Sequence, residues 1–490
     1  MLTTCLLEQL RGVFCAAVGR ATKCTRSLRT TRVAIVGGGL GHGLASTVGC
    51  LILVTPNCSG GLVHRLLKRV IGQLPPARIR SREDSAWSVA VLGLFPSRTN
   101  HLRLNMTNKF CATMLAVVGF VIVAVPASLW LYSKYNSQKP KVYAKTDGKL
   151  FDRVSKHVPV LKKVYTLPWW CPFGDAQTIV SGTLRKCPPL PFIREVIEFE
   201  DGGALGIDWL HPEGCADDAP IVLFLPGITG STRDCSYILY PAQKICARKW
   251  RVVVYNPRGL GGVHLRNRIA YNSVRHHDVA EVIKRISSRY PKAKMIGCGF
   301  SMGGMVLWNY LATCTKENVV LQGALIVSSP FDPSSTTNSL ESFFAKYTYN
   351  RHITKKLVAF AERYREHYED HEVMNFDNVL KSVTIREFDT RFTAPLFGYD
   401  SVDHYYAHAA PNKKVQKIPV PTLCLNADDD CFSPKEAIPV NEMSASESVV
   451  GVVTRGGGHT AFLRTGNPNQ GGLVDELLIE WATMLINDLY

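Results

Sequence analysis

Ser301 lies between two glycines in a pattern typical of a catalytic nucleophile. Residues 299–303 read Gly-Phe-Ser-Met-Gly, which is G-x-S-x-G. In such a pattern the serine occupies a strained turn between a strand and a helix, with its hydroxyl exposed. The apolar run 294–298 fits the strand and the run 306–312 fits the helix. Because this short pattern also arises by chance, the other parts of a serine-based site must be sought elsewhere in the chain.

Candidate partners for the serine follow two later apolar runs. Residues 420–426 resemble a buried strand and lead into three consecutive aspartates, 428–430. Residues 448–454 resemble another strand, which is followed by three glycines and His459. The order serine, acid, histidine is that of α/β-hydrolases. Spacing alone does not choose among the aspartates, and an aspartate-rich turn beside a surface histidine is the structural alternative.

These residue types together could carry out acyl transfer. A serine hydroxyl becomes a good nucleophile when a base removes its proton, and neutral imidazole can do this near pH 7. A carboxylate then orients the imidazole and stabilises its charged form. The oxygen that becomes negative on the substrate needs N–H donors. We expect these donors to be the backbone amides of Met302, directly after the serine, and Ile228, in the loop after the predicted strand 219–225.

The segments that must position these residues alternate between strands and helices. A strand is predicted at 252–255, and a helix at 278–290 carries its apolar residues on one stripe. The alternation predicts an α/β protein with a doubly wound, mostly parallel sheet, its core formed by 191–332 and 412–490. The stretch 473–489 has apolar residues at helical spacing and is predicted to pack against this core.

Several longer stretches resemble the membrane-anchored α/β-hydrolases that include abhydrolase domain-containing proteins 1 and 3. They are residues 201–209, 225–230, 301–305, 385–393, 397–399 and 426–434. The family pattern places its acid two residues before a Phe-Ser-Pro step, which corresponds to Asp430, and its histidine after a Gly-Gly pair, which corresponds to His459. Asp175 departs from the pattern, because the family has a basic residue after the corresponding Trp-Cys segment.

The resemblance implies an enzyme that hydrolyses an acyl ester of a phospholipid without a cofactor or metal. Medium-chain or truncated phosphatidylcholines are the substrates it suggests. Members of the family also act on acylglycerols or make and cleave medium-chain esters, so an acylglycerol lipase or ester synthase is the alternative. A membrane binding protein without catalytic activity is the alternative from another class.

Residues 333–411 are predicted to form a helical cap, since they separate a strand at 325–327 from the strand at 420–426. A cap in this place would shape an acyl-chain pocket and exclude water. Ordinary packing on the core is the alternative for most of its aromatic residues. These are Phe343, Phe344, Tyr347, Tyr349, Phe360, Tyr364, Tyr368, Tyr405 and Tyr406.

Residues 110–132 contain no charged side chain and are long enough to form a transmembrane helix. Trp130 and Tyr132, with lysines after them, resemble an interfacial belt. The sequence thus predicts a single-pass protein of the endoplasmic reticulum or another internal membrane, with 133–190 as a membrane-proximal extension. Lysines after the helix, and glycosylation sequons only before it, favour a cytosolic catalytic part.

The net charge of +17 belongs mainly to the N-terminal segment. Residues 1–109 hold 15 Lys and Arg against 3 Asp and Glu, whereas the remainder holds 42 against 37. The high charge therefore does not indicate nucleic-acid binding. Because the family usually begins just before its helix and Met106 lies there, we expect 1–105 to be dispensable. The 15 cysteines form no Cys-x2-Cys pair, so neither a zinc site nor a disulfide framework is expected.

Overall fold

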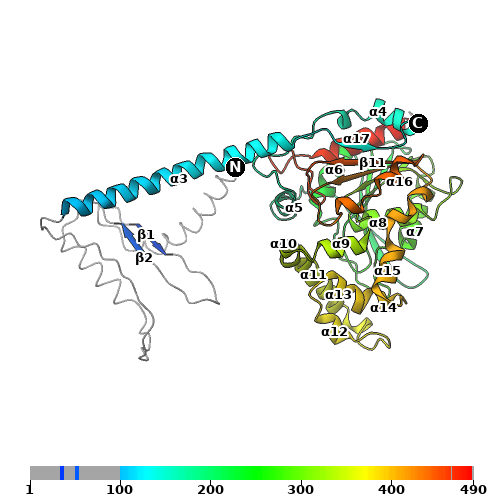
Figure 1. The fold of residues 1–490 in the computed structure, drawn as a ribbon. Coiled ribbons are helices and arrows are strands. Elements are labelled where there is room, and N and C mark those ends of the chain that lie inside the picture. The colour runs from blue at the N-terminus through cyan, green and yellow to red at the C-terminus, as the bar shows by residue number, and fades with distance from the viewer. Residues whose placement is uncertain (1–33, 38–49, 54–99, 465, 488–490) are drawn as a thin grey trace. The chain divides into compact units, whose positions relative to one another are not determined.

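The computed structural model describes the backbone of residues 34–37, 50–53, 100–464 and 466–487, and side chains from residue 113 onward with the same later gap (Figure 1). Strands β1 (Ala34–Gly37) and β2 (Cys50–Leu53) pair antiparallel. The rest of the basic segment up to residue 99 lies outside the described residues, so its dispensability stays a prediction.

A nine-stranded sheet forms the centre of the hydrolase part, in the order β3-β11-β10-β9-β8-β6-β7-β5-β4. The strands are β3 (Lys141–Tyr143), β4 (Ile193–Glu198), β5 (Ala204–Leu210), β6 (Ile221–Leu225), β7 (Arg251–Asn256), β8 (Met295–Phe300), β9 (Leu321–Val327), β10 (Thr422–Ala427) and β11 (Val449–Thr454). Strands β6 to β11 pair in parallel with one another, and β3, β4 and β5 pair antiparallel with their neighbours. The prediction of a mostly parallel sheet is confirmed.

Helices cover both faces of the sheet because successive side chains of each strand point to opposite faces. In β6, Val222 and Phe224 pack with α4 (Lys149–His157), α6 (Ser236–Cys246) and α17 (Leu473–Ile486). Ile221 and Leu223 pack on the other face with α7 (His277–Arg289), α8 (Met302–Leu311) and α16 (Val440–Ser444). The sheet is therefore doubly wound, as predicted.

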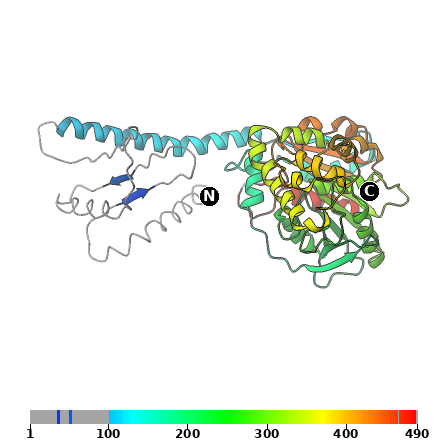
Figure 2. The same cartoon turned by 90° about the horizontal axis from the view of Figure 1, so that it is seen from below.

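The predicted cap at 333–411 consists of helices and loops without a strand, and Figure 2 shows it from below. Its helices are α9 (Pro333–Ser339), α10 (Phe343–Ala345), η3 (Lys346–Asn350), α11 (Arg351–Arg363), η4 (Arg365–His367), α12 (Phe376–Leu380), α13 (Ile385–Phe388), η5 (Asp389–Thr393), α14 (Ala394–Leu396) and α15 (Val402–Ala409). Phe360, Tyr364 and Tyr368 are buried in a core within the cap. For Tyr364 and Tyr368, the alternative of ordinary packing is the observed one.

The extension at 133–190 contributes directly to the hydrolase fold. Strand β3 pairs with β11 at the edge of the sheet, and α4 belongs to the core on one face. The helix α5 (Gly174–Thr183) follows η2 (Pro159–Lys162) in the same segment. Two further short helices, η6 (Pro411–Lys417) and η7 (Lys435–Ala437), lie close to β10 in sequence.

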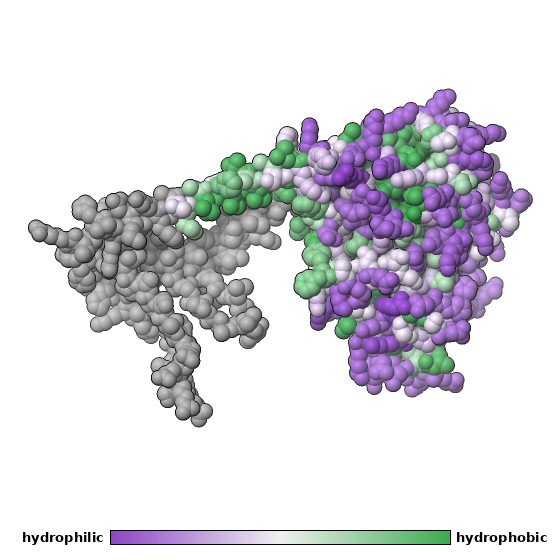
Figure 3. Space-filling model, viewed as in Figure 1, coloured by the Kyte–Doolittle hydropathy of each residue, from purple (hydrophilic) through white to green (hydrophobic). Residues whose placement is uncertain are grey.

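The predicted membrane span lies within a longer helix, α3 (Asn100–Asn136). Its stretch Thr113–Asn136 contains an 18-residue window with a mean hydropathy of 2.4 and is long and apolar enough to cross a membrane. The space-filling view shows hydrophobic residues along this stretch (Figure 3). The side chains of Trp130, Tyr132 and Tyr135 are exposed near its end.

Candidate active site

Ser301 lies at the turn between β8 and α8, with φ of +52° and ψ of −123°. This left-handed conformation is strained for a residue with a side chain. A Cβ at Gly303 would stand 2.4 Å from the carbonyl oxygens of Leu225 and Pro226, and a Cβ at Gly299 would stand 2.7 Å from the Gly303 oxygen. Gly303 is therefore required for the turn to pack against the end of β6, and Gly299 is required for the end of β8 to lie close to the start of α8.

The three side chains expected to act together lie in one hydrogen-bonded line. His459 Nε2 is 2.9 Å from Ser301 Oγ. His459 Nδ1 is 2.9 Å and 3.1 Å from the two carboxylate oxygens of Asp430. The Asp430 side chain is fully buried and that of His459 is 12 % exposed. Such an arrangement can pass a proton from a hydroxyl to an imidazole whose other nitrogen faces an acid.

The other two aspartates hold the glycine loop that carries His459. The backbone N–H of Gly456 donates to Asp428 Oδ1 at 3.0 Å, and that of Gly458 donates to Asp429 Oδ1 at 2.9 Å. Burial, reinforced by the neighbouring carboxylates, raises the pKa of Asp429 to about 6. Spacing left these three acids equivalent, whereas in the structure only Asp430 contacts the imidazole.

Helix α5 supports the same loop from the other side. The backbone N–H of His459 donates to Thr178 Oγ1 at 2.8 Å. A Cβ at Gly458 would be 2.2 Å from the carbonyl oxygen of Gly174, and a Cβ at Gly174 would be 2.4 Å from the Asp429 carboxyl carbon. Sequence reasoning missed this support, because Thr178 and His459 are far apart in the chain and share no local pattern.

The loop after β6 contacts the nucleophile turn. The Gly227 N–H donates to the Tyr237 hydroxyl at 3.0 Å, which fixes the start of the loop. Ile228 and Met302 both line the cavity that contains Ser301. Within the hydrogen bonds of the described residues, neither amide N–H of these two has a protein acceptor. Both amides are thus available for the oxyanion role expected from the sequence, which stays a prediction.

An aromatic ring packs on the imidazole of His459. Phe432 stacks against His459 with ring centres 4.2 Å apart. Its backbone N–H also donates to Asp430 Oδ1 at 2.8 Å. Phe432 therefore holds both the histidine and the acid, a role that sequence reasoning did not assign to it. Its position in the Phe-Ser-Pro step was the available signal.

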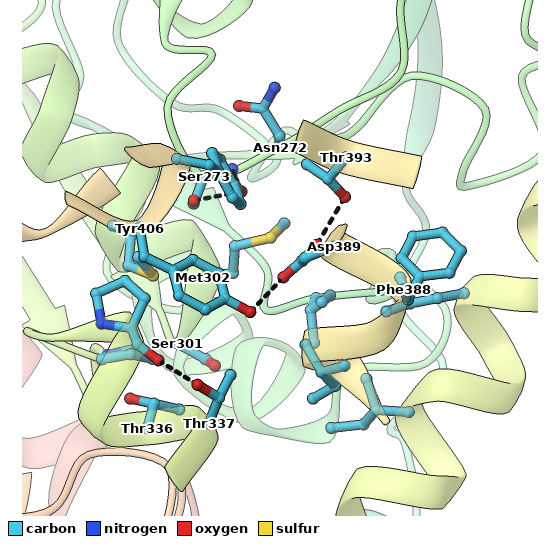
Figure 4. A pocket seen from close by; sticks show the side chains of 18 of the residues that line it. Asn272, Ser273, Ser301, Met302, Thr336, Thr337, Phe388, Asp389, Thr393 and Tyr406 are labelled. Atoms are coloured by element: carbon cyan, nitrogen blue, oxygen red, sulfur yellow. Dashed lines mark hydrogen bonds between the residues drawn. The ribbon is translucent and has the colours of Figure 1, made fainter. Parts of the chain in front are cut away.

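A cavity of about 110 Å³ lies between Ser301 and the cap. One part of its wall is apolar and comes from the cap, from residues that include Leu340, Ile353, Leu357 and Phe388. Another part is polar and includes Asn272, Ser273 and Asp389 (Figure 4). The predicted cap thus forms the roof of a pocket over the serine. Among its predicted aromatic residues, Phe360, Tyr405 and Tyr406 reach this pocket.

Asp389 is an acidic group in the pocket that sequence reasoning did not assign to the site. Its carboxylate accepts hydrogen bonds from Tyr406 Oη at 2.9 Å and Thr393 Oγ1 at 2.6 Å (Figure 4). Burial raises the pKa of this carboxyl to about 6. Asp389 lies in the stretch 385–393 that carried the family resemblance, so the signal was present without a role attached to it.

Asp175, the acid that stands where the family has a basic residue, links α5 to the cap. Its side chain and its backbone oxygen each accept from the Tyr349 hydroxyl at 3.1 Å. The substitution therefore has a structural partner in this chain. No group of three or more His, Cys, Asp and Glu residues that could hold a metal ion occurs in the part of the chain that the structure describes.

Comparison with known proteins places this site in a family. The sequence model of the family described as "alpha/beta hydrolase fold" matches residues 220–464. The Caenorhabditis elegans protein named abhd-3.2 is 48% identical over 375 residues, which cover 76% of this chain and 99% of that protein. Phospholipase ABHD3 of Homo sapiens is 32% identical over 376 residues, covering 76% of this chain and 90% of its own.

A more distant relative is the monoacylglycerol lipase of Saccharomyces cerevisiae, which is 26% identical over 52% of this chain and 57% of its own length. The similarity to abhd-3.2 and ABHD3 is greater in both identity and coverage. With its sheet, cap and nucleophile turn, this chain belongs to the α/β-hydrolase family, in the group of ABHD3-type hydrolases.

Proposed function

We propose that this chain is a membrane-anchored serine hydrolase that cleaves an acyl ester of phospholipids through an acyl-serine intermediate. The observation that carries the proposal is the hydrogen-bonded chain of Asp430, His459 and Ser301. His459 Nδ1 lies 2.9 Å from Asp430 Oδ2, and His459 Nε2 lies 2.9 Å from Ser301 Oγ. A nucleophile beside a base, with that base oriented by a buried acid, is what acyl transfer requires.

In the proposed reaction, Ser301 Oγ attacks the ester carbonyl carbon while His459 Nε2 takes its proton. The amides of Met302 and Ile228 donate to the oxygen that becomes negative, and losing one such donor typically costs about 2.7–4 kcal/mol of barrier. The imidazolium then protonates the departing alcohol. Water, deprotonated by His459, finally releases the fatty acid from the serine. The scheme needs no cofactor.

The pocket supports an acyl chain as part of the substrate, because its cap wall is apolar and adjoins the serine. Its volume of about 110 Å³ is small beside the roughly 300–1,000 Å³ of usual ligand sites. A medium-chain or truncated phosphatidylcholine fits this limit better than a long-chain lipid. The name phospholipase carried by the ABHD3 relatives is the second support for this substrate class.

An acylglycerol lipase or medium-chain ester synthase is the second candidate, favoured by the similarity to the yeast monoacylglycerol lipase. The two candidates are separated by assaying defined lipids. Faster release of fatty acid from short phosphatidylcholine than from monoacylglycerol supports the phospholipase. Transfer of the acyl group to ethanol in preference to water supports the synthase.

A fluorophosphonate probe tests whether the site reacts at all. The wild-type protein should be labelled, and Ser301→Ala should not, since the probe reacts with an activated serine. An intact wild-type protein that resists labelling would instead favour a membrane binding protein without catalysis. Hydrolysis of phosphatidylcholine by the labelled protein, absent in Ser301→Ala, tests the substrate class separately.

We further propose that α3 anchors the enzyme in the endoplasmic reticulum or another internal membrane, with the catalytic part in the cytosol. The length and mean hydropathy of Thr113–Asn136 support the anchor. The lysines that follow the apolar stretch support the orientation. Protease treatment of sealed microsomes should digest the catalytic part if it faces the cytosol, and should spare it if it faces the lumen.

A further inference from the structure

Large aromatic side chains are exposed on two neighbouring segments of the hydrolase part. Phe343 is 85%, Phe344 46% and Tyr347 60% exposed in α10 and η3. Phe173, immediately before α5, is 46% exposed. Figure 3 shows hydrophobic residues at the edge of the molecule where Figure 1 places α5 and α10. We call these four residues the aromatic face.

Ring contacts and a hydrogen bond connect the members of the aromatic face through neighbouring residues. The Tyr349 hydroxyl donates to Asp175 in α5, and the Tyr349 ring lies 6.0 Å from that of Phe344. Phe173 in turn contacts Tyr132 near the end of α3, with ring centres 4.7 Å apart. The aromatic face is therefore continuous with the end of the proposed membrane helix.

The same rings lead inward to the catalytic histidine. Tyr349 contacts Phe432 with ring centres 5.4 Å apart, and Phe432 stacks on His459 at 4.2 Å. Leu340 and Ile353 flank this segment of the cap and line the cavity. Residues 340–353 thus have one side on the pocket and another in solvent, joined by apolar side chains.

Exposed aromatic residues that gather on one surface usually mark a binding surface. Tyrosine and tryptophan rings are favoured at the boundary between water and lipid, where one end can be wet and the other apolar. The adjoining end of α3 carries Trp130 and Tyr132, which suit the same boundary. The neighbouring residues of α3 thus indicate that the aromatic face binds a lipid bilayer.

We propose that the aromatic face inserts into the headgroup region of the bilayer that holds α3, and that the acyl chain reaches the pocket along Phe344, Tyr349 and Phe432. This inference rests on the proposed function, since it requires a bilayer lipid as substrate. It adds a docking surface and a route for the substrate. A partner protein covering the same surface is an outcome that the test below would reveal.

The first experiment compares two double variants in the full chain, reconstituted in phosphatidylcholine vesicles. Phe343→Ser/Tyr347→Ser alters the aromatic face at two rings that lie outside the proposed route of the acyl chain. Val373→Ser/Val383→Ser is the matched control, since these valines are also exposed in the cap, at 67% and 53%. We expect at least a tenfold loss of vesicle hydrolysis in the first variant only. Fluorophosphonate labelling and turnover of a water-soluble butyrate ester should remain at the wild-type level in both.

Two results of this experiment would overturn the proposal. One is wild-type hydrolysis of vesicle lipid by Phe343→Ser/Tyr347→Ser. The other is an equal loss of turnover of vesicle lipid and of the soluble ester. That result would mean that these rings maintain the structure of the active site and do not dock the protein on the bilayer.

A second experiment does not depend on catalysis. Phe343→Trp should gain fluorescence that brominated phosphatidylcholine in the vesicles quenches, whereas Val373→Trp should gain fluorescence that it does not quench. Quenching at residue 343 in a protein that hydrolyses no phosphatidylcholine would support the docking surface and contradict phosphatidylcholine as the substrate. Absence of quenching at 343 in a protein that does hydrolyse it would refute the docking surface, with a partner protein as the remaining occupant.

Discussion

The three adjacent acids Asp428, Asp429 and Asp430 differ in the groups that form hydrogen bonds with their carboxylate oxygens. Asp430 faces an imidazole nitrogen, whereas Asp428 and Asp429 accept from the backbone N–H groups of Gly456 and Gly458. An amide side chain can still accept from a backbone N–H, but it cannot stabilise an imidazolium as a carboxylate does. The same substitution at each position should therefore have very different effects.

We expect Asp430→Asn to lower kcat by about 10⁴-fold, the loss seen when the acid of such a triad becomes an amide. Asp428→Asn and Asp429→Asn should each keep kcat within about tenfold of wild type, since the glycine loop retains its acceptor. Steady-state hydrolysis of a soluble ester measures all three. A collapse of kcat in Asp429→Asn with near-normal Asp430→Asn would reassign the catalytic acid.

The raised pKa of Asp389 should make the stability of the folded protein depend on pH. Its pKa is raised from 3.8 to about 6 in the folded protein because the carboxyl is buried. Between these values the native state holds a proton that the unfolded state has released, so the free energy of unfolding falls as pH rises. An asparagine at this position cannot ionise. The free energy of unfolding of Asp389→Asn, relative to that of wild type, should therefore rise by about 2 kcal/mol between pH 4 and 6.5.

Urea unfolding at several pH values measures this gain. Asp429, which titrates in the same range, is present in both proteins and cancels in the difference. A difference between Asp389→Asn and wild type that stays constant with pH would show that Asp389 is not the group responsible.

At the scale of elements, an ion-pair cluster ties helix α7 to the antiparallel end of the sheet. The guanidinium of Arg258, 1% exposed, donates to both oxygens of Asp278 at 2.7 Å and 2.8 Å and to Asp201 at 3.0 Å. Asp201 lies in the turn between β4 and β5, and Asp278 lies in the first turn of α7. Removing Arg258 would take two hydrogen bonds from the buried Asp278 carboxylate and leave it with the 3.2 Å contact to the partly exposed Arg275.

Arg258→Met should destabilise the fold by about 3–5 kcal/mol, the usual cost of breaking a buried pair by removing one partner. The matched control is Arg266→Met, whose pair with Glu198 is exposed at 45% and 68%, and it should cost less than about 1 kcal/mol. Denaturant unfolding compares the two. Equal losses in both variants would show that the cluster has no special stabilising role.

The sequence predicted those elements whose signal is local. Each parallel strand is a short apolar run because both its faces are covered, so β6 to β11 were recognisable. Strand β3 has only three residues and begins with an exposed lysine, so no pattern marks it. The contact of Thr178 with His459 and the place of Asp389 in the pocket could not be predicted, since both depend on how distant segments pack.

For the molecule as a whole, the proposed anchor α3 would hold the hydrolase part beside a lipid substrate. The side chains of Val121, Ile122 and Val123 are exposed on α3, at 49%, 61% and 69%. A water-soluble protein would not gain by exposing three adjacent aliphatic residues on one helix, whereas a bilayer would surround them with lipid chains. The anchor can therefore be tested apart from catalysis.

Val121→Lys/Val123→Asp should release the protein from membranes, since each charge at the centre of a span costs about 2.5–3.5 kcal/mol for insertion. Val121→Leu/Val123→Leu is the matched control and should remain bound. Carbonate extraction of membranes followed by assay of both fractions measures the shift. Because the triad lies outside α3, the released variant should keep its turnover of a soluble ester and lose that of vesicle lipid. A charged variant that stays in the membrane pellet would place the anchor outside this helix.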